Sequence, residues 1–370
     1  MKVLLLSTDS QVFNNGSAVR ERIKEYGTLV EELHVIVYTR PGFKEEIFGN
    51  ISLWPTNNKF RAGYFRHVYR LARGIIKNRE DWVISSQDPF ETGWVGYKLK
   101  RQFNIPLQVQ VHTDFMSPYF FGMFWINQFR AMLAKWLLKK ADNIRVVSER
   151  IRKSITSYIP HLTDKIVVLP IFFDAMRFQK AVSNNQYPED FLILTVARLE
   201  PEKNLSLAIK TITDLIYQYS DKKIRYVIIG SGGEEKRLNS LIEALAVKDR
   251  IFIKQVDASD LPGWYKRADL FLLTSNYEGY GMVVAESIAA GTPVVMSDVG
   301  LAGEVVKNGE NGFIFPVGNE EALQAILIKI LNKEIDLEKL KIGTKAMANA
   351  FSNKSAYLES MRKSWDSLLR

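Results

Sequence analysis

Two carboxylates with glycines between them form the strongest chemical signal in this sequence. Glu278 and Glu286 stand on either side of a pair of glycines, which follows the predicted strand Leu270–Thr274 and opens a helical pattern. Glycines at a strand-to-helix turn let backbone N–H groups approach a ligand, and a helix N-terminus favours an anion. The eight-residue spacing predicts that the two carboxylates contact different parts of one extended ligand. An ordinary turn with a solvent-facing glutamate is the competing interpretation.

Two cations follow another predicted strand in the same half of the chain. Arg198 and Lys203 come directly after Phe191–Val196, and we expect Lys203 at the start of the next helix. Arg grips oxygens with two parallel hydrogen bonds and Lys acts as a mobile point charge, so the pair suits a phosphate. A cation in the first helical turn opposes the helix dipole, and a bound anion would account for it. A solvated loop pair is the alternative.

Further candidates lie at the ends of other predicted strands. Gly230 and Gly232 form a third glycine turn, and Gly16 precedes a helix that Ser17 is placed to cap. His112 ends a strand, where a polar group facing a cleft would act. Taken singly, a structural histidine and a plain capping turn are the stronger interpretations of His112 and Gly16.

Metal, redox and dinucleotide chemistry find no support in the sequence. The chain has no Cys, which excludes disulfides, iron–sulfur clusters and thiol nucleophiles and fits a reducing compartment, and its four His lack ligand spacing. Neither a dinucleotide fingerprint nor a P-loop occurs, and a D-x-D pair is absent too. We therefore expect no metal and no cofactor.

The first apolar run is too short for a signal peptide and no run reaches the length of a membrane span, so a cytoplasmic location is expected.

Short apolar runs alternate with helical patterns along the whole chain, which indicates βαβ units. The length of 370 residues and the ordinary apolar fraction of 46% favour two globular domains and exclude disorder. The polar segment Asp174–Asp190 is predicted to be a linker. The predicted fold class is α/β, with two doubly wound domains over residues 1–180 and 187–350 that face each other across a cleft. A last helix, in residues 351–370, is expected to pack back on the first domain. The predicted strands are Val3–Ser7, His34–Tyr38, Trp82–Ser85, Leu107–Val111, Asn143–Val147, Lys165–Leu169, Phe191–Val196, Arg225–Ile229, Ile251–Ile253, Leu270–Thr274, Pro293–Met296 and Gly312–Phe315.

The net charge of +9 lies entirely in the first half of the chain. Residues 1–180 carry 27 Lys and Arg against 16 Asp and Glu, whereas residues 181–370 carry 23 against 25. Two basic amphipathic helices are predicted there, over Phe65–Lys77 and Trp125–Lys140, and such helices can lie on an anionic membrane. The alternative for each helix is an apolar stripe in the core beneath a solvated charged face. No motif for nucleic acid stands out, so nucleic acid is not an expected partner.

Taken together, these motifs resemble the GT4 family of retaining glycosyltransferases. The second half carries the resemblance through Arg198 and Lys203, Gly230-Ser231-Gly232, Glu278 and Glu286, Gly291–Val295 and Glu304–Phe313; the first half carries it through Gly16, His112 and the strand order. The resemblance implies the GT-B fold, which has two Rossmann-like domains with the active site between them. It also implies a nucleoside diphosphate sugar as donor, UDP- or GDP-linked, held mainly by the second domain.

The resemblance further implies a role for each candidate residue. Arg198 and Lys203 match the diphosphate clamp, which neutralises the leaving group without a metal. Glu286 matches the residue that binds the ribose, and His112 the residue beside the transferred sugar. The remaining implied donor contacts are Gly16, Gly230, Gly232, Glu278, Gly279, Tyr280, Gly281, Met282 and Val283.

The mechanism and the acceptor also come from the resemblance. Retention of configuration implies front-face attack, with the departing phosphate helping to deprotonate the acceptor. The expected reaction moves a hexose to a lipid-linked or glycan acceptor, in glycolipid or cell-surface polysaccharide synthesis at the cytoplasmic face of a membrane. A soluble transferase with a small acceptor, and a non-catalytic anion-binding or lipid-binding protein of the same fold, are the alternatives. Asn15-Gly16-Ser17 departs from the Gly-Gly of many relatives, and Tyr280 replaces the common Phe.

Overall fold

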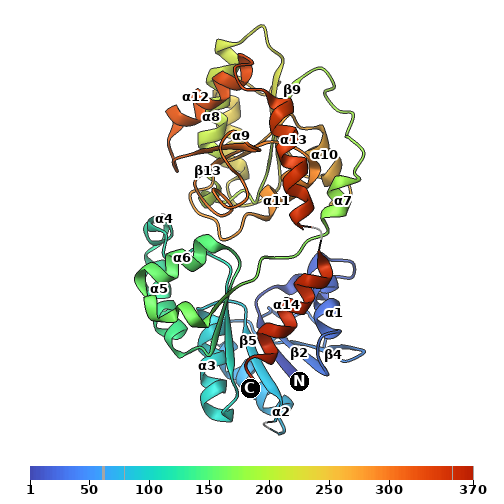
Figure 1. Cartoon of the computed structure of the whole chain (residues 1–370), viewed down its shortest axis with the longest axis vertical. Coiled ribbons are helices and arrows are strands. Elements are labelled where there is room, and N and C mark those ends of the chain that lie inside the picture. Colours follow the sequence, from blue (N-terminus) through green and yellow to red (C-terminus); the bar gives the residue numbers. More distant parts are fainter. Residues whose placement is uncertain (61–62, 79, 352, 370) are drawn as a thin grey trace. The chain divides into compact units, whose positions relative to one another are not determined.

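The computed structural model describes residues 1–60, 63–78, 80–351 and 353–369, and its chain forms two compact units (Figure 1). The first unit is Met1–Pro170 with Lys354–Arg370, and the second is Ile171–Asn353. The first unit therefore ends at Pro170 rather than at residue 180. Divided in this way, the first unit carries 29 basic and 17 acidic residues, a net charge of +12, and the second carries 21 and 24, a net charge of −3.

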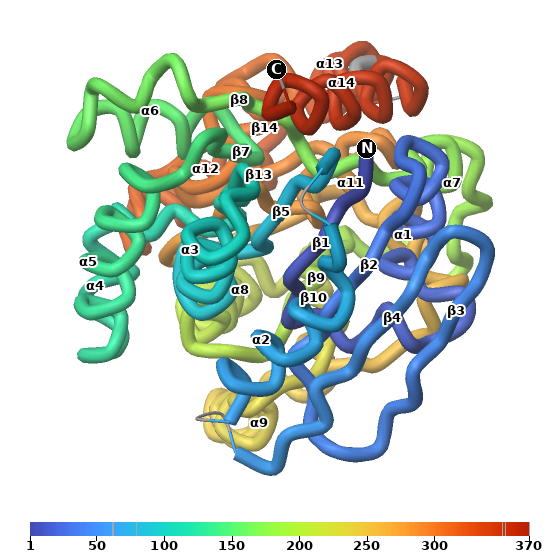
Figure 2. The backbone as a smooth tube through the Cα atoms, turned by 90° about the horizontal axis from the view of Figure 1, so that it is seen from below, coloured from blue at the N-terminus to red at the C-terminus, as the bar shows by residue number. Residues whose placement is uncertain are grey.

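The first unit is built on an eight-stranded sheet. Its strand order is β3-β4-β2-β1-β5-β6-β7-β8, and every neighbouring pair is parallel except β3 and β4. Figure 2 shows β1 between β2 and β5, which is the point where the strand order reverses. Strand β1 is a continuous apolar run over Val3–Leu6 because helices cover both faces of the sheet. The strands are β1 Lys2–Ser7, β2 Glu32–Val37, β3 Glu46–Phe48, β4 Ile51–Pro55, β5 Trp82–Ser86, β6 Leu107–Val111, β7 Asn143–Val146 and β8 Ile166–Val168.

The helices of the first unit divide between the two faces of this sheet. A Cβ on Gly96 in α3 would touch Leu107, whereas Trp365 in α14 donates a hydrogen bond to Gln108. Since successive strand residues point to opposite faces, α3 and α14 cover opposite sides. Helix α14 lies beside α1 (Figure 1). The helices are α1 Ala18–Gly27, α2 Tyr64–Ile75, α3 Glu91–Phe103, α4 Pro118–Met123, α5 Trp125–Lys140, α6 Glu149–Tyr158 and α14 Lys354–Asp366.

The second unit contains a six-stranded parallel sheet with the order β11-β10-β9-β12-β13-β14. Helices α8, α9 and α12 pack on one face, and α7, α10, α11 and α13 pack together on the other (Figure 1). The strands are β9 Phe191–Val196, β10 Ile224–Ile229, β11 Ile251–Lys254, β12 Leu270–Leu273, β13 Val294–Ser297 and β14 Gly312–Phe315. The helices are α7 Ala175–Gln179, α8 Leu205–Gln218, α9 Glu235–Ala244, α10 Leu261–Arg267, α11 Met282–Ala290, α12 Glu320–Leu331 and α13 Leu337–Ala348.

Three local predictions differ from the structure. The predicted linker contains α7, whose N-cap Asp174 accepts a hydrogen bond from the backbone N–H of Arg177. Lys203 is not in the first turn of a long helix; it ends the 3-10 helix Pro201–Lys203, and α8 starts two residues later. Strands β3 and β4 were not predicted, because they are short and Pro55 interrupts the strand pattern. Within the described part of the chain, no helix is long and apolar enough to cross a bilayer.

Candidate active site

The point where the strand order of the second sheet reverses brings two predicted motifs together. Strands β9 and β12 are neighbours in this sheet although two strands separate them in the sequence. The loop after β9 carries both cations, and the loop after β12 carries Glu278. Two hydrogen bonds join these loops. The backbone N–H of Asn276 donates to the carbonyl of Glu202 over 2.7 Å, and the side-chain Oγ1 of Thr274 donates to the carbonyl of Lys203 over 3.0 Å. Ligands of doubly wound sheets bind at such a reversal point.

Each of the two cations is paired with a carboxylate. Lys203 Nζ lies 2.5 Å from Glu278 Oε1, and both side chains are only 13% exposed. Ser275 Oγ donates to the same oxygen over 2.9 Å. Arg198 is different, because it is 73% exposed and donates to Glu202 Oε1 over 2.9 Å. If a diphosphate bound here, its oxygens would replace the two carboxylates as the partners of Lys203 and Arg198.

Gly230 and Gly232, in the turn after β10, lie too close to neighbouring backbone atoms to carry a side chain. A Cβ on Gly230, whose φ is +153°, would lie 1.9 Å from the carbonyl oxygen of Ala197, and a Cβ on Gly232 would lie 2.5 Å from that of Leu199. The N–H of Leu199 also donates to the carbonyl of Ser231 over 2.9 Å. These glycines therefore hold the loops after β9 and β10 against each other, and any donor contact there would come from the backbone.

Helix α11 presents its N-terminus beside Glu278. Gly281 is the N-cap with a φ of +88°, a backbone conformation that glycine adopts without strain. The next two residues, Met282 and Val283, begin the helix, and their N–H groups have no partner within it. The ring of Tyr280 is buried, so the Phe-to-Tyr departure lies in the core. The start of this helix can therefore bind an anion.

Glu286 lies in the second turn of α11 and accepts a 2.8 Å hydrogen bond from Tyr265 OH of α10. Burial raises the pKa of Glu286 to about 7, although Tyr265 and Arg177 both act to lower it. The carboxyl therefore changes charge close to neutral pH. The carboxylate form is acceptor-only and accepts hydrogen bonds more strongly than the protonated form, so it is the form that suits the two hydroxyls of a ribose diol.

Binding of a nucleotide sugar is expected to strengthen about tenfold from pH 6 to pH 8, because Glu286 loses its proton over this range. Isothermal titration with UDP-glucose and GDP-mannose measures this, since their diphosphates are esterified at both ends and do not titrate there. Glu286→Gln should weaken binding at pH 8 and flatten the profile. An unchanged pH profile in this variant would show that another group titrates.

The first unit holds the two remaining candidates at its own strand ends. Gly16 precedes α1 with a φ of +79°, in the left-handed region, and Ser17 Oγ caps that helix by accepting from the N–H of Arg20. His112 follows β6, and its Nε2 lies 2.9 Å from Gln110 Oε1. Burial, together with Arg145 and Arg22, lowers the pKa of His112 to about 3. The ring is therefore neutral at physiological pH and can bind a hydroxyl without carrying charge.

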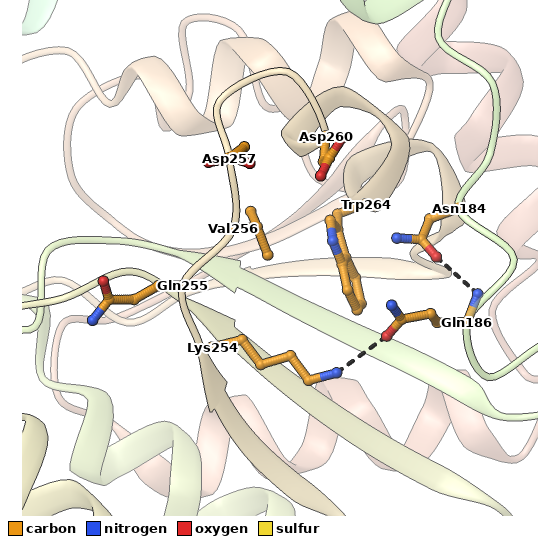
Figure 3. A pocket seen from close by; sticks show the side chains of 8 residues that line it. All are labelled: Asn184, Gln186, Lys254, Gln255, Val256, Asp257, Asp260 and Trp264. Atoms are coloured by element: carbon orange, nitrogen blue, oxygen red, sulfur yellow. Dashed lines mark hydrogen bonds between the residues drawn. The ribbon is translucent and has the colours of Figure 1, made fainter.

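A cavity of about 510 Å³ opens beside the loop after β11 (Figure 3). Val256 and Trp264 face into it, whereas the side chain of Gln255 points away. Lys254 Nζ donates to Gln186 Oε1 over 3.1 Å and lies 5.2 Å from the ring of Trp264. The cavity walls are Asn184, Gln186, Lys254, Gln255, Val256, Asp257, Asp260 and Trp264. The described residues include no cluster of three or more His, Cys, Asp or Glu that could hold a metal ion.

Two family descriptions match consecutive parts of the chain. "Glycosyltransferase Family 4" matches residues 19–177, and "Glycosyl transferases group 1" matches residues 176–347. The chain belongs to glycosyltransferase family 4. The described fold is accordingly GT-B, with two Rossmann-like domains.

The relatives of this family 4 glycosyltransferase vary in the acceptors that their names state. An uncharacterised glycosyltransferase of Methanocaldococcus jannaschii is 22% identical over 87% of this chain and 86% of its own. The GtfA subunit of a UDP-N-acetylglucosamine–peptide N-acetylglucosaminyltransferase of Streptococcus pneumoniae is 24% identical, over 87% of this chain and 64% of its own. An alpha-monoglucosyldiacylglycerol synthase of the same species is 24% identical, over 62% of this chain and 55% of its own.

Solved structures share the fold of this glycosyltransferase over almost its whole length. HepE of Anabaena, solved in complex with UDP, has a TM-score of 0.75 at 17% identity and covers 99% of this chain and 100% of its own. Sucrose-phosphate synthase from Thermosynechococcus elongatus has a TM-score of 0.82 at 17% identity and covers 100% of this chain and 99% of its own.

The side chains that hold the predicted site residues of this glycosyltransferase were not predicted from the sequence. Tyr265 holds Glu286, Ser275 and Lys203 hold Glu278, and Glu202 holds Arg198. Only the i, i+4 spacing of Arg198 and Glu202 was a signal visible in the sequence. The other contacts join different loops or helices, and no local pattern predicts them.

Proposed function

We propose that this chain is a retaining, metal-independent hexosyltransferase that uses a UDP- or GDP-sugar and a lipid-linked or glycan acceptor. Its pathway would be glycolipid or cell-surface polysaccharide synthesis at the cytoplasmic face of a membrane. The observation that carries the proposal is the cluster of Arg198, Lys203, Glu278 and the N-terminus of α11 at the reversal point of the second sheet. A protein that only bound an anion would not need the buried Glu278 beside its cations.

This cluster supplies the parts that transfer from a sugar diphosphate requires. The cations and the N–H groups of α11 stabilise charge as the diphosphate leaves, which supports a reaction without a metal. Glu278 is placed to accept hydrogen bonds from sugar hydroxyls, and Glu286 from the ribose. The backbone of Gln255–Asp257, beside the cavity of Figure 3, is then the segment that meets the nucleoside base. HepE, which shares this fold, is solved with UDP-glucose, and this agrees with the proposed donor class.

Release of UDP or GDP from a panel of sugar nucleotides tests the reaction. We expect one donor to turn over at the same rate with and without EDTA, and an anomeric proton coupling in the product that matches the donor. Loss of turnover in EDTA that Mg²⁺ or Mn²⁺ restores would contradict metal independence. An inverted anomer would contradict retention, and no turnover of any donor with membrane-lipid or glycan acceptors would contradict the hexosyltransferase.

An exposed apolar surface in the basic unit supports an acceptor at a membrane. We call it the α5 face; it is formed by Phe124, Trp125, Ile126, Phe129, Met132 and Trp136. Trp125 is 74% exposed and Phe129 and Met132 are each 58% exposed, whereas the opposite side of α5 is buried. Lys139 and Lys140 are exposed at the end of the helix, which has no acidic residue. Large exposed apolar patches with a basic border fit an anionic membrane surface.

The other predicted membrane helix behaves differently. Val68 and Ala72 of α2 are completely buried, so much of its apolar stripe belongs to the core of the first unit. The core interpretation is therefore correct for those residues of α2. For α5 the core interpretation is wrong, because the predicted stripe includes four exposed residues, Trp125, Phe129, Met132 and Trp136. The residues of α5 that pack in the core are Ala131, Ala134, Leu137 and Leu138.

The double substitution Trp125→Ser with Phe129→Ser is expected to weaken binding to phosphatidylglycerol vesicles at least tenfold, because each large apolar side chain contributes about 1.5–3 kcal/mol when buried. Sedimentation with vesicles at rising salt measures this. Ile47→Ser is the matched control, since Ile47 is 73% exposed in the same unit but lies outside the α5 face. Failure of the unmodified protein to bind at low salt would contradict the membrane proposal, as would equal binding to neutral phosphatidylcholine.

A further inference from the structure

A buried layer of polar side chains lies between the sheet of the first unit and α14. Strands in a doubly wound sheet are normally apolar on both faces, yet this layer places five buried polar residues on three adjacent strands. Its members are Ser85 of β5, Gln108 and Gln110 of β6, and Asn143 and Arg145 of β7. All their hydrogen bonds described below lie within the first unit. The layer ends at His112, two residues after Gln110.

One end of α14 fixes the orientation of the amides in this layer. Trp365 Nε1 donates to Gln108 Oε1 over 3.1 Å, and an indole can only donate, so this atom of Gln108 is the oxygen. Ser85 Oγ donates its single proton to the same oxygen over 3.0 Å. The Ser85 oxygen must therefore accept from its other neighbour, which is Gln110 Nε2 at 2.9 Å. This chain of contacts sets the amide nitrogen of Gln110 toward Ser85.

Arg145 of β7 fixes Gln110 independently. Arg145 Nη1 donates to Gln110 Oε1 over 3.1 Å, and a guanidinium has no acceptor, so the atom it contacts is again the oxygen. Arg145 Nη2 donates to Tyr357 OH over 3.2 Å, and this hydroxyl lies 2.6 Å from Tyr26 OH of α1. Arg145 is also held by the backbone carbonyls of Leu169 and Pro170, over 3.4 and 3.3 Å. The Trp365 contact from α14 and the Arg145 contact from β7 thus give Gln110 the same orientation.

The orientation of Gln110 determines which nitrogen of His112 carries the proton. Gln110 Oε1 lies 2.9 Å from His112 Nε2 and can only accept. His112 Nε2 must then be the protonated nitrogen, and Nδ1 keeps its lone pair. Because the ring is neutral, a single tautomer follows from this contact.

We propose that the buried polar layer holds His112 in the Nε2–H tautomer, with Arg145 and Gln110 as positioning residues and Trp365 of α14 as a second constraint on Gln110. His112 Nδ1 is then an acceptor, which would bind a hydroxyl of the transferred sugar and cannot protonate a leaving group. This deepens the proposed function and rests on it for the sugar contact. The tautomer itself depends only on the contacts within the first unit.

Long-range ¹H–¹⁵N spectra of the full chain, labelled with ¹⁵N-histidine, measure the tautomer directly. The chain has four His, and the His112→Asn variant assigns the signal. We expect Nε2–H in the unmodified protein and in Gln110→Glu, which keeps an acceptor oxygen. Gln110→Met removes the acceptor and should give a mixture of tautomers or Nδ1–H, with kcat/KM lowered about tenfold. Nδ1–H in the unmodified protein, or an unchanged spectrum in Gln110→Met, would overturn the proposal.

The two constraints on Gln110 are tested with Trp365→Phe and Arg145→Met, singly and combined. Because the two contacts are independent, each single variant should retain Nε2–H and the double variant should show both tautomers. Tyr158→Phe, which alters an exposed tyrosine in the same unit, is the control. A double variant that folds and keeps one tautomer would overturn the role of these two contacts. The spectra require no substrate, so a protein with the expected tautomer and no transferase activity would contradict only the proposed function.

Discussion

Lys203→Ala is expected to lower kcat/KM by about 10²–10³-fold with the preferred sugar nucleotide, which is the loss seen when one preorganised charge partner is removed from a developing anion. Lys203 is 13% exposed, so its charge acts on the diphosphate with little solvent screening. Its removal would also leave the Glu278 carboxylate facing the diphosphate without a cation, which adds repulsion. Steady-state release of UDP or GDP measures the loss.

Three further variants make this result specific. Arg198→Ala should cost less, about tenfold to 10²-fold, because Arg198 is 73% exposed and its charge is screened by water and salt. Lys248→Ala removes an exposed ion pair with Glu243 in the same unit and should leave turnover unchanged. Lys203→Arg keeps the charge and should recover part of the rate. Unchanged turnover in both Lys203→Ala and Arg198→Ala would contradict the diphosphate site.

Glu278→Gln is expected to separate donor binding from transfer. The substitution preserves size and removes the charge that pairs with Lys203 over 2.5 Å. Lys203 is then released from its carboxylate partner, so UDP or GDP alone should bind as tightly as before or up to tenfold more tightly. Turnover of the sugar nucleotide should nevertheless fall about 10²-fold, because the amide accepts hydrogen bonds from sugar hydroxyls less strongly than a carboxylate does.

Calorimetry measures the affinity for free UDP or GDP, and steady-state assays with the sugar nucleotide measure turnover. Glu243→Gln, an exposed glutamate of the same unit, is the control and should change neither. A parallel loss of nucleotide binding and turnover in Glu278→Gln would show that Glu278 only supports the loop, and unchanged turnover would remove it from the sugar site.

Local sequence patterns were sufficient to predict most of the sheet. Leu107–Val111, Phe191–Val196 and Gly312–Phe315 have the predicted bounds, and a helix follows Gly281 as expected. Buried parallel strands are short segments rich in apolar residues, and that signal can be recognised without knowledge of the neighbouring strands. The short pair β3 and β4 was missed because its residues owe their strand conformation to pairing with each other and with β2.

The candidate site was predictable in its residue types and not in its contacts. Glu278, Lys203 and Arg198 were identified from chemistry and from their positions after strands. Their pairing depends on β9 and β12 being neighbours, which is a property of the strand order. The glycines at 230 and 232 were predicted to contact the ligand, and that stays a prediction. The structure adds a packing reason for them, because the carbonyls of Ala197 and Leu199 leave no room for a Cβ.

The sequence by itself determined the α/β class, the strand ends where chemistry occurs, and a basic first half with a near-neutral second half, because each is a local or additive property. Tertiary structure decided the rest. It exposed the apolar side of α5, raised the pKa of Glu286 to about 7 by burial, and connected α14 to His112 through Gln110. Burial, pKa and the direction of a buried hydrogen bond depend on groups distant in the sequence, so only the folded chain specifies them.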